Sequence, residues 1–202
     1  MIKNYIFDFG NVLTQFYPDK LTAPFLADEE KRKIVRDVVF DRLYWDRLDD
    51  GSLTDAVLKE EIRSRLPEDL YDVACKVYDH WVQTMEPVEG MQELICDLQK
   101  SDKKLYLLSN ISISFAETYQ EVKWIKELFD RFDGLVLSGS IGLVKPNKEI
   151  FEYLLNKYNL TAEECLFIDD SEKNILGAEK AGIKGYLFDG DAKKLKNYLD
   201  VC

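Results

Sequence analysis

The sequence predicts an α/β protein: a Rossmann-like, mainly parallel sheet with helices on both faces, plus an inserted helical-bundle cap. Two observations predict this fold. From Val88 onward, short apolar runs typical of buried strands alternate with helical patterns. Between the first strand and this alternation, residues 16–88 show helical periodicity and no strand pattern.

The first predicted strand ends abruptly at an acidic residue. Tyr5, Ile6 and Phe7 are apolar and strand-prone, Asp8 follows them, and Gly10-Asn11 is a turn signal. The carboxyl ends of parallel strands are where open α/β sheets bind ligands. Asp8 is therefore a candidate site residue as well as a candidate turn residue.

Residues 16–88 are expected to be wholly helical. Apolar residues recur there at helical spacing, and Thr54 is a plausible N-cap for a helix that ends before Pro67. A further helical stripe is stopped by Pro87. We therefore predict a core formed by residues 1–15 and 89–202, with residues 16–88 as a helical cap.

The remaining elements complete the alternation of strands and helices. Helices are expected over residues 91–98, 115–129, 149–158, 174–181 and 193–199, and strands over 104–108, 135–137, 165–168 and 185–188. Right-handed crossovers place the carboxyl end of every parallel strand at one edge of the sheet. Side chains that follow these strands should therefore meet.

Polar residues follow three of the predicted strands. The groups expected at the shared edge are Asp8, Ser109-Asn110 and Asp169-Asp170, together with Lys145 from the loop between the last two. Ionised carboxylates in one pocket repel each other, so two of the three should have raised pKa values unless a cation is present. Oxygen ligands suit Mg²⁺. The chain's one histidine, His80, lies in the helical segment and is expected to be a packing or surface residue, which argues against zinc.

The other groups at this edge suit a phosphoryl dianion. Ser109 offers a hydroxyl and Asn110 a backbone amide at a strand-to-helix turn, and the amides of Phe9 and Gly10 can form an anion nest. Lys145 supplies a positive charge. A carboxylate such as Asp8 can attack phosphorus in line and form an aspartyl phosphate that water cleaves.

Net charge, hydrophobic run lengths and cysteine spacing argue against several kinds of partner and location. The 202 residues carry a net charge of -11, which disfavours nucleic acid and anionic membrane surfaces as partners. No apolar run is long enough to span a bilayer, and the first strand begins too early for a signal peptide. The four cysteines, Cys75, Cys96, Cys165 and Cys202, have no metal-like spacing. A reduced, cytoplasmic protein is expected; the sequence indicates no oligomeric state.

These motifs, in this order, resemble those of the haloacid dehalogenase-like hydrolase superfamily. The four are Asp8-Phe9-Gly10-Asn11-Val12, Leu108-Ser109-Asn110, Lys145-Pro146 and Asp169-Asp170. The position of the helical insert, directly after the first motif, is similar to that in the type-1 cap group. The sequence around the motifs most resembles that of bacterial glucose-1-phosphate phosphatase-like proteins. The resemblance implies that Asp8 is the nucleophile and that Mg²⁺ is held by Asp8, Asp170 and the carbonyl of Gly10. It also implies that Asp169 binds the metal directly or through water.

Gly10 departs from the family pattern. Phosphatases of the superfamily usually carry at this position a second Asp, which protonates the leaving oxygen and activates water. Three explanations for the absence of this Asp stay open. The leaving group departs unprotonated, as an anomeric sugar hydroxyl can; another acid or water takes the place of the Asp; or the protein is slow or inactive. Asn11 stands where the family often has Gly, and Asn tolerates the left-handed conformation.

The sequence thus predicts a Mg²⁺-dependent phosphatase acting on a small phosphorylated metabolite, with a sugar phosphate such as a sugar 1-phosphate as the expected substrate class. The alternatives are a non-catalytic or weakly active phosphate-binding regulatory module and, ranked lower, a sugar phosphomutase or phosphotransferase. Carbon–halogen chemistry is disfavoured by Asp169-Asp170. Candidate substrate contacts in the cap, each also a candidate packing residue, are Phe16, Tyr17, Tyr44 and Trp45.

Overall fold

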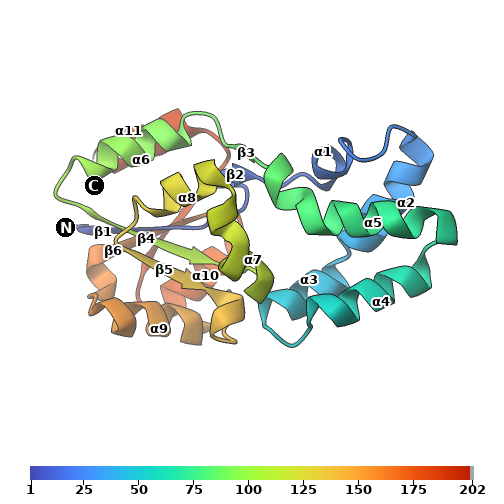
Figure 1. The fold of residues 1–202 in the computed structure, drawn as a ribbon. Helices are drawn as coiled ribbons and strands as arrows, with labels where there is room; N and C mark the ends of the chain where they lie inside the picture. The colour runs from blue at the N-terminus through green and yellow to red at the C-terminus, as the bar shows by residue number, and fades with distance from the viewer. Residues whose placement is uncertain (201–202) are drawn as a thin grey trace.

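The computed structural model describes residues 1–200, which form a sheet-containing part and a group of helices beside it (Figure 1). Cys202 lies outside the described residues. No helix of the described chain is both long and apolar enough to cross a membrane.

A five-stranded parallel sheet forms the centre of the first part. Its order is β5-β4-β1-β6-β7. The strands are β1 (Asn4–Phe7), β4 (Lys104–Ser109), β5 (Gly134–Leu137), β6 (Cys165–Asp169) and β7 (Lys184–Leu187). β1 lies in the middle and pairs in parallel with both β4 and β6. The predicted strand alternation is confirmed, and the carboxyl ends of β1, β4 and β6 adjoin.

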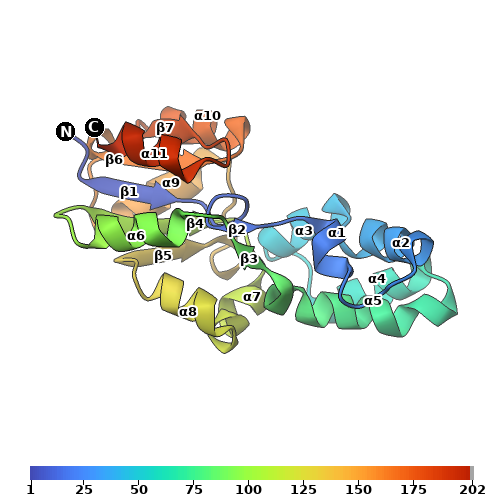
Figure 2. The same cartoon turned by 90° about the horizontal axis from the view of Figure 1, so that it is seen from above.

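Helices cover both faces of this sheet (Figure 2). The helices are α6 (Met91–Gln99), α7 (Ile113–Thr118), α8 (Lys123–Phe129), α9 (Lys148–Tyr158), α10 (Glu172–Lys180) and α11 (Ala192–Leu199), with short 3-10 turns η2 (Tyr119–Glu121), η3 (Ser138–Ser140) and η4 (Ala162–Glu164). Tyr5 and Phe7 pack in one apolar cluster with α6, α8 and α11. Ile6 points into the other, with α9 and α10. The alternation of side chains along β1 therefore serves two cores.

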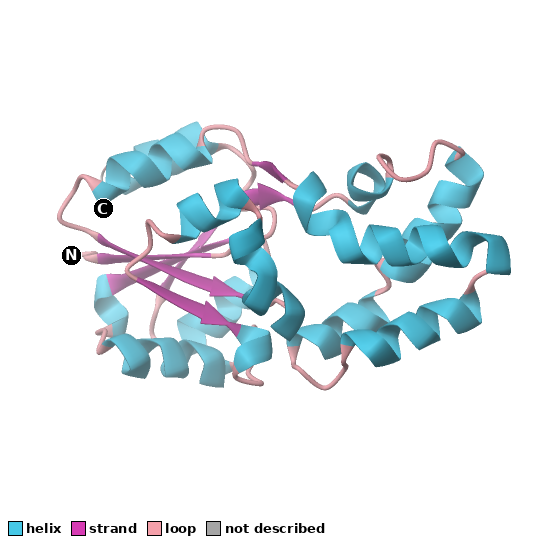
Figure 3. Cartoon of the chain, in the orientation of Figure 1, coloured by secondary structure: helices cyan, strands magenta, loops and turns pink. Residues whose placement is uncertain are grey.

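The second part is helical (Figure 3). We call it the helical lobe: α1 (Pro18–Thr22), α2 (Glu29–Val39), α3 (Arg42–Asp49), α4 (Asp55–Arg65), α5 (Glu68–His80) and the 3-10 turn η1 (Trp81–Thr84). Most of its buried side chains form a cluster of their own, whereas Leu21 and Trp81 belong to the cluster that contains Tyr5 and Phe7. Thr54 caps α4 as predicted, since its side chain accepts a hydrogen bond from the N–H of Val57.

Two short strands join the two parts. β2 (Thr14–Gln15) and β3 (Glu86–Pro87) pair antiparallel. The expectation that residues 16–88 are wholly helical is therefore wrong at Glu86 and Pro87. The pairing joins segments far apart in the sequence, and a two-residue strand has no periodicity by which a local pattern could reveal it.

Candidate active site

Asp8 lies at the carboxyl end of the central strand. Its N–H donates to the carbonyl of Ile168 on β6 over 2.9 Å, which continues the sheet ladder one residue beyond β1. Only 8% of Asp8 is exposed. Its carboxylate accepts a 2.7 Å hydrogen bond from the N–H of Phe9, whose ring is buried in the core. The sheet and the adjacent amide therefore hold this carboxylate in place.

Asp169 and Asp170 extend from the neighbouring strand to the same point. One carboxylate oxygen from each of Asp8, Asp169 and Asp170 lies within 4.8 Å of the others. Asp169 is fully buried and accepts hydrogen bonds from the N–H of Ser171 at 2.8 Å and from Nδ2 of Asn174 at 3.0 Å. The expected convergence of the three carboxylates is confirmed.

Lys145 is buried among these acids. Its Nζ lies 2.7 Å from Oδ1 of Asp8 and 2.8 Å from Oδ2 of Asp169. Its main chain is clasped by Asn110: the N–H of Lys145 donates to Oδ1 over 2.8 Å, and Nδ2 donates to the carbonyl of Lys145 over 2.9 Å. The Asn110 side chain thus positions the lysine. Ser109 is nearly fully buried at the end of β4 and lines the cavity into which Asp8 and Lys145 face.

Burial dominates the electrostatics of the site. It raises the pKa of Asp8 to about 7, against the opposing attraction of Lys145. Burial and the neighbouring charge of Asp169 also raise the pKa of Asp170. Burial alone would lower the pKa of Lys145, but the adjacent Asp8 and Asp169 outweigh it and raise that pKa. A cluster that resists ionisation in this way is suited to a cation that would compensate the negative charges.

The donor set fits a hard divalent cation. Three carboxylates converge, and the site adjoins Gly10, whose carbonyl lies in the same loop. Oxygen ligands of this kind suit Mg²⁺. His80 is exposed at the end of α5 in the helical lobe, as the sequence led us to expect, and takes no part in this cluster.

Asn11 connects the first loop to the rest of the site. It adopts the left-handed conformation, with φ of 55°, that the sequence analysis allowed for. Its Nδ2 donates to Asp170 over 3.2 Å, and its Oδ1 accepts from the N–H of Phe16 over 3.0 Å. Asn11 therefore links a carboxylate of the cluster to the start of the helical lobe.

The cluster opens into a cavity of about 570 Å³ between the sheet edge and the helical lobe. An aromatic wall formed by Phe16, Phe40, Trp45 and Trp81 lines the lobe side. Trp45 and Trp81 meet edge to face with ring centres 5.0 Å apart, and Phe40 stacks on Trp45 at 5.5 Å. The acids and the lysine thus form one end of a cavity whose opposite side combines this aromatic wall with charged residues of α3 and its C-terminus, namely Arg42, Asp46, Asp49 and Asp50.

The structure separates the four aromatic candidates of the sequence analysis. Phe16 and Trp45 line the cavity. Tyr17 is half exposed and does not line it, and Tyr44 is buried in the lobe, where its hydroxyl accepts a hydrogen bond from Arg65. Phe40 and Trp81 were missed, because helical spacing alone does not show which side of a helix faces a second part of the molecule.

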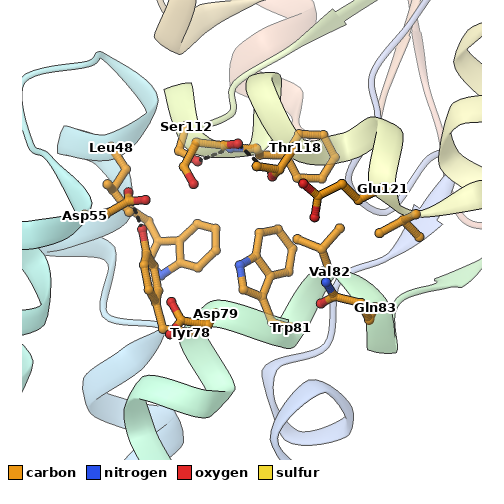
Figure 4. A pocket seen from close by; sticks show the side chains of 14 residues that line it. Leu48, Asp55, Tyr78, Asp79, Trp81, Val82, Gln83, Ser112, Thr118 and Glu121 are labelled. Atoms are coloured by element: carbon orange, nitrogen blue, oxygen red, sulfur yellow. Dashed lines mark hydrogen bonds between the residues drawn. The ribbon is translucent and has the colours of Figure 1, made fainter.

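A second, smaller cavity of about 130 Å³ lies behind this wall (Figure 4). Trp45 and Trp81 line both cavities. The hydroxyl of Tyr78 donates to Asp55 over 2.8 Å at its edge. Burial and this bond raise the pKa of Tyr78. The two tryptophans thus act as a partition, and the acidic cluster belongs to the larger cavity.

Comparison with known proteins agrees with this geometry. Residues 2–182 match the family model of the haloacid dehalogenase-like hydrolases. The chain is 29% identical to D-ribitol-5-phosphate phosphatase of Bacteroides thetaiotaomicron over 92% of this chain and 91% of that protein. It is 24% identical to sesquiterpene phosphatase astK of Aspergillus oryzae, over 91% and 88%.

Solved structures share the fold. A HAD-like family hydrolase from Porphyromonas gingivalis superposes with a TM-score of 0.75 at 24% identity, covering 100% of this chain and 98% of that one. A HAD family enzyme of Bacteroides thetaiotaomicron, in complex with magnesium and inorganic phosphate, gives a TM-score of 0.73 at 23% identity, with 96% and 99% covered. The ordered motifs, the acidic cluster and the family match agree: this chain belongs to the haloacid dehalogenase-like hydrolases.

Proposed function

We propose that this hydrolase is a Mg²⁺-dependent phosphatase that releases phosphate from a small phosphorylated metabolite, with a sugar phosphate as the preferred class. The observation that carries the proposal is the buried contact of Lys145 with Asp8 beside Asp169 and Asp170, at the end of a cavity large enough for a metabolite. The names of the two phosphatases to which the chain is similar support this reading.

In the proposed reaction Asp8 attacks phosphorus in line and water later cleaves the aspartyl phosphate. Lys145, Ser109, Asn110 and the amides of Phe9 and Gly10 would hold the phosphoryl group. The N–H of Phe9 now bonds Asp8 itself. Lys145 would exchange part of its contact with the carboxylates for the phosphoryl oxygens.

Asp8, Asp170 and the carbonyl of Gly10 would hold Mg²⁺, with Asp169 binding it directly or through water. When bound, the cation would neutralise the carboxylates and offset charge on the phosphoryl oxygens. The raised pKa values of Asp8 and Asp170 support this assignment, because these carboxylates ionise more readily beside a cation.

The helical lobe would act as a cap over this site, with residues 16–88 as the cap and residues 1–15 and 89–202 as the core. The apolar cluster that lies wholly within the helical lobe and the β2–β3 connection support the division. A cap would exclude water and select the leaving group. Its aromatic wall offers flat apolar surfaces to a sugar ring, and an anomeric phosphate would supply a leaving group that needs less help from an acid.

Phosphate release tests the proposal. The panel is glucose 1-phosphate, glucose 6-phosphate and p-nitrophenyl phosphate, each with Mg²⁺ and with EDTA. We expect Mg²⁺-dependent turnover that Asp8→Asn abolishes and that the exposed control Asp102→Asn retains. Absence of turnover on every ester by folded protein in Mg²⁺ would contradict the phosphatase.

Gly10 favours a second candidate, a non-catalytic phosphate-binding module, because no carboxyl stands at that position. Phosphate that raises the melting temperature without any turnover would support this candidate. Transfer of the phosphoryl group to an added sugar rather than to water would instead identify the lower-ranked mutase or phosphotransferase.

A further inference from the structure

The inference below rests on the proposed phosphatase and concerns the proton that the leaving oxygen requires. Gly10 has no side chain to supply it. A Cβ built at Gly10 would meet no atom within 4 Å, so the position of the missing carboxyl faces open space in the cavity. A side chain that donates this proton would therefore come from another wall.

Asp49 is a carboxyl group on the opposite wall. It is the last residue of α3 and lines the cavity that contains Asp8 and Lys145. Within residues 1–200 no hydrogen bond or ion pair engages its carboxyl group. Two neighbouring acids are engaged: Asp46 pairs with Arg42 at 2.7 Å, and Asp50 accepts a 2.8 Å bond from the N–H of Ser52. Among these three acids of α3 and its C-terminus, Asp49 is thus the one whose carboxyl group is free to exchange a proton with a substrate.

The backbone of Asp49 is docked on the core. Its carbonyl accepts a 2.6 Å hydrogen bond from the hydroxyl of Ser138, which is fully buried and itself accepts from the N–H of Ile111 at 2.8 Å. Ile111 follows Asn110, the residue that clasps Lys145. This chain of contacts sets Asp49 relative to the carboxyl ends of the strands.

The turn after α3 lets the helical lobe approach the core closely. Gly51 has φ of +75°, and a Cβ built there would lie 3.1 Å from the carbonyl oxygen of Gly139. A Cβ at Gly139 would lie 2.6 Å from the carbonyl oxygen of Ile111. A larger residue at Gly51 would push the lobe away from the core, and one at Gly139 would displace the η3 turn on which Gly51 packs. The two glycines therefore allow α3 to end against the strand edge.

The charges around Asp49 suit proton transfer near neutral pH. Burial raises its pKa to about 7. Arg42 and Lys145 oppose this rise, and Asp46 and Asp50 add to it. An acid with a pKa close to the working pH can both give and accept a proton efficiently.

We propose that Asp49 of the helical lobe is the general acid and base of this phosphatase, in place of the carboxyl that Gly10 lacks. In the first step Asp8 forms the bond to phosphorus, the bond from phosphorus to the leaving oxygen breaks, and that oxygen takes the proton of Asp49. In the second step the Asp49 carboxylate takes a proton from water, and the water oxygen bonds to phosphorus. The bond to Asp8 then breaks, which regenerates both carboxyl groups and frees inorganic phosphate.

The test compares leaving groups in Asp49→Asn. The leaving group of glucose 6-phosphate is the 6-oxygen of glucose, which would depart as a strongly basic alkoxide unless Asp49 protonates it. The leaving group of p-nitrophenyl phosphate is p-nitrophenolate, which is stable enough to depart without a proton. We expect kcat/KM to fall about 10²- to 10⁴-fold for the sugar ester and less than about threefold for the aryl ester. The decline of kcat/KM for the sugar ester above about pH 7 should also disappear.

Two further variants complete the test. The matched control Asp50→Asn, one residue away, should keep kcat/KM for both esters within about threefold. Gly10→Asp placed in the Asp49→Asn protein should restore sugar-ester turnover at least tenfold, because the space at Gly10 is open.

The outcomes separate this inference from the function on which it rests. Unchanged kcat/KM for glucose 6-phosphate in Asp49→Asn, or an equal loss on both esters, would overturn the role of Asp49 while the phosphatase stands. Wild-type protein that releases phosphate from no ester would overturn both.

Discussion

Lys145 provides the sharpest test of how the site is held together. Its side chain is 1% exposed and lies 2.7 Å from Asp8 and 2.8 Å from Asp169. With an effective dielectric constant of about 20, each contact is worth about 6 kcal/mol of attraction. The cost of burying the charges offsets most of this. Lys145→Met keeps an unbranched side chain one heavy atom shorter and removes the ammonium group with its charge and hydrogen bonds, so that two buried carboxylates lose their cation.

Removal of one member of a buried ion pair typically costs 3–5 kcal/mol. We therefore expect Lys145→Met to lower the free energy of unfolding by about 3–5 kcal/mol in EDTA near pH 8. The loss should shrink near pH 5, because Asp8, with a pKa already raised to about 7, then takes up a proton instead of remaining an unpaired charge.

Urea unfolding followed by tryptophan fluorescence measures this loss. The control is Lys148→Met, which removes an exposed lysine that pairs with Glu152 at 2.6 Å and should cost no more than about 1 kcal/mol. A loss for Lys145→Met equal to that of the control at both pH values would refute the reasoning that the buried pair organises the site.

Three further predictions follow from the same geometry. In EDTA the free energy of unfolding should fall between about pH 4 and pH 7, because the pKa of Asp8 is 3.8 when unfolded and about 7 when folded; its contribution is complete below the lower value and lost above the higher one. Saturating Mg²⁺ should flatten this slope in urea titrations, and an unchanged slope would argue against the cation site. Asp170→Asn should remove the rise in melting temperature that Mg²⁺ causes, and a rise equal to that of the wild type would exclude Asp170 as a ligand. Ser138→Ala should cost about 1–3 kcal/mol in urea unfolding, since the N–H of Ile111 and the carbonyl of Asp49 lose a buried partner; a change below about 0.5 kcal/mol would show that water replaces the hydroxyl.

The sequence by itself determined the fold class and the convergence of the acids. Apolar runs that alternate with helical patterns specify a parallel sheet, and a parallel sheet brings Asp8 and Asp169 to one edge whatever the details of packing. Local hydrogen bonding also made single positions predictable, such as the cap at Thr54 and the left-handed Asn11.

The tertiary structure alone decided what faces the acids. Tyr17 and Tyr44 looked like cavity residues and are not, whereas Phe40 and Trp81 are. The β2–β3 pair and the Ser138–Asp49 bond join segments that are more than 70 residues apart. A sequence pattern reports which side of an element is apolar, but the partner of that side depends on how distant segments pack, and this is why Asp49 became visible as a site residue only in the folded chain.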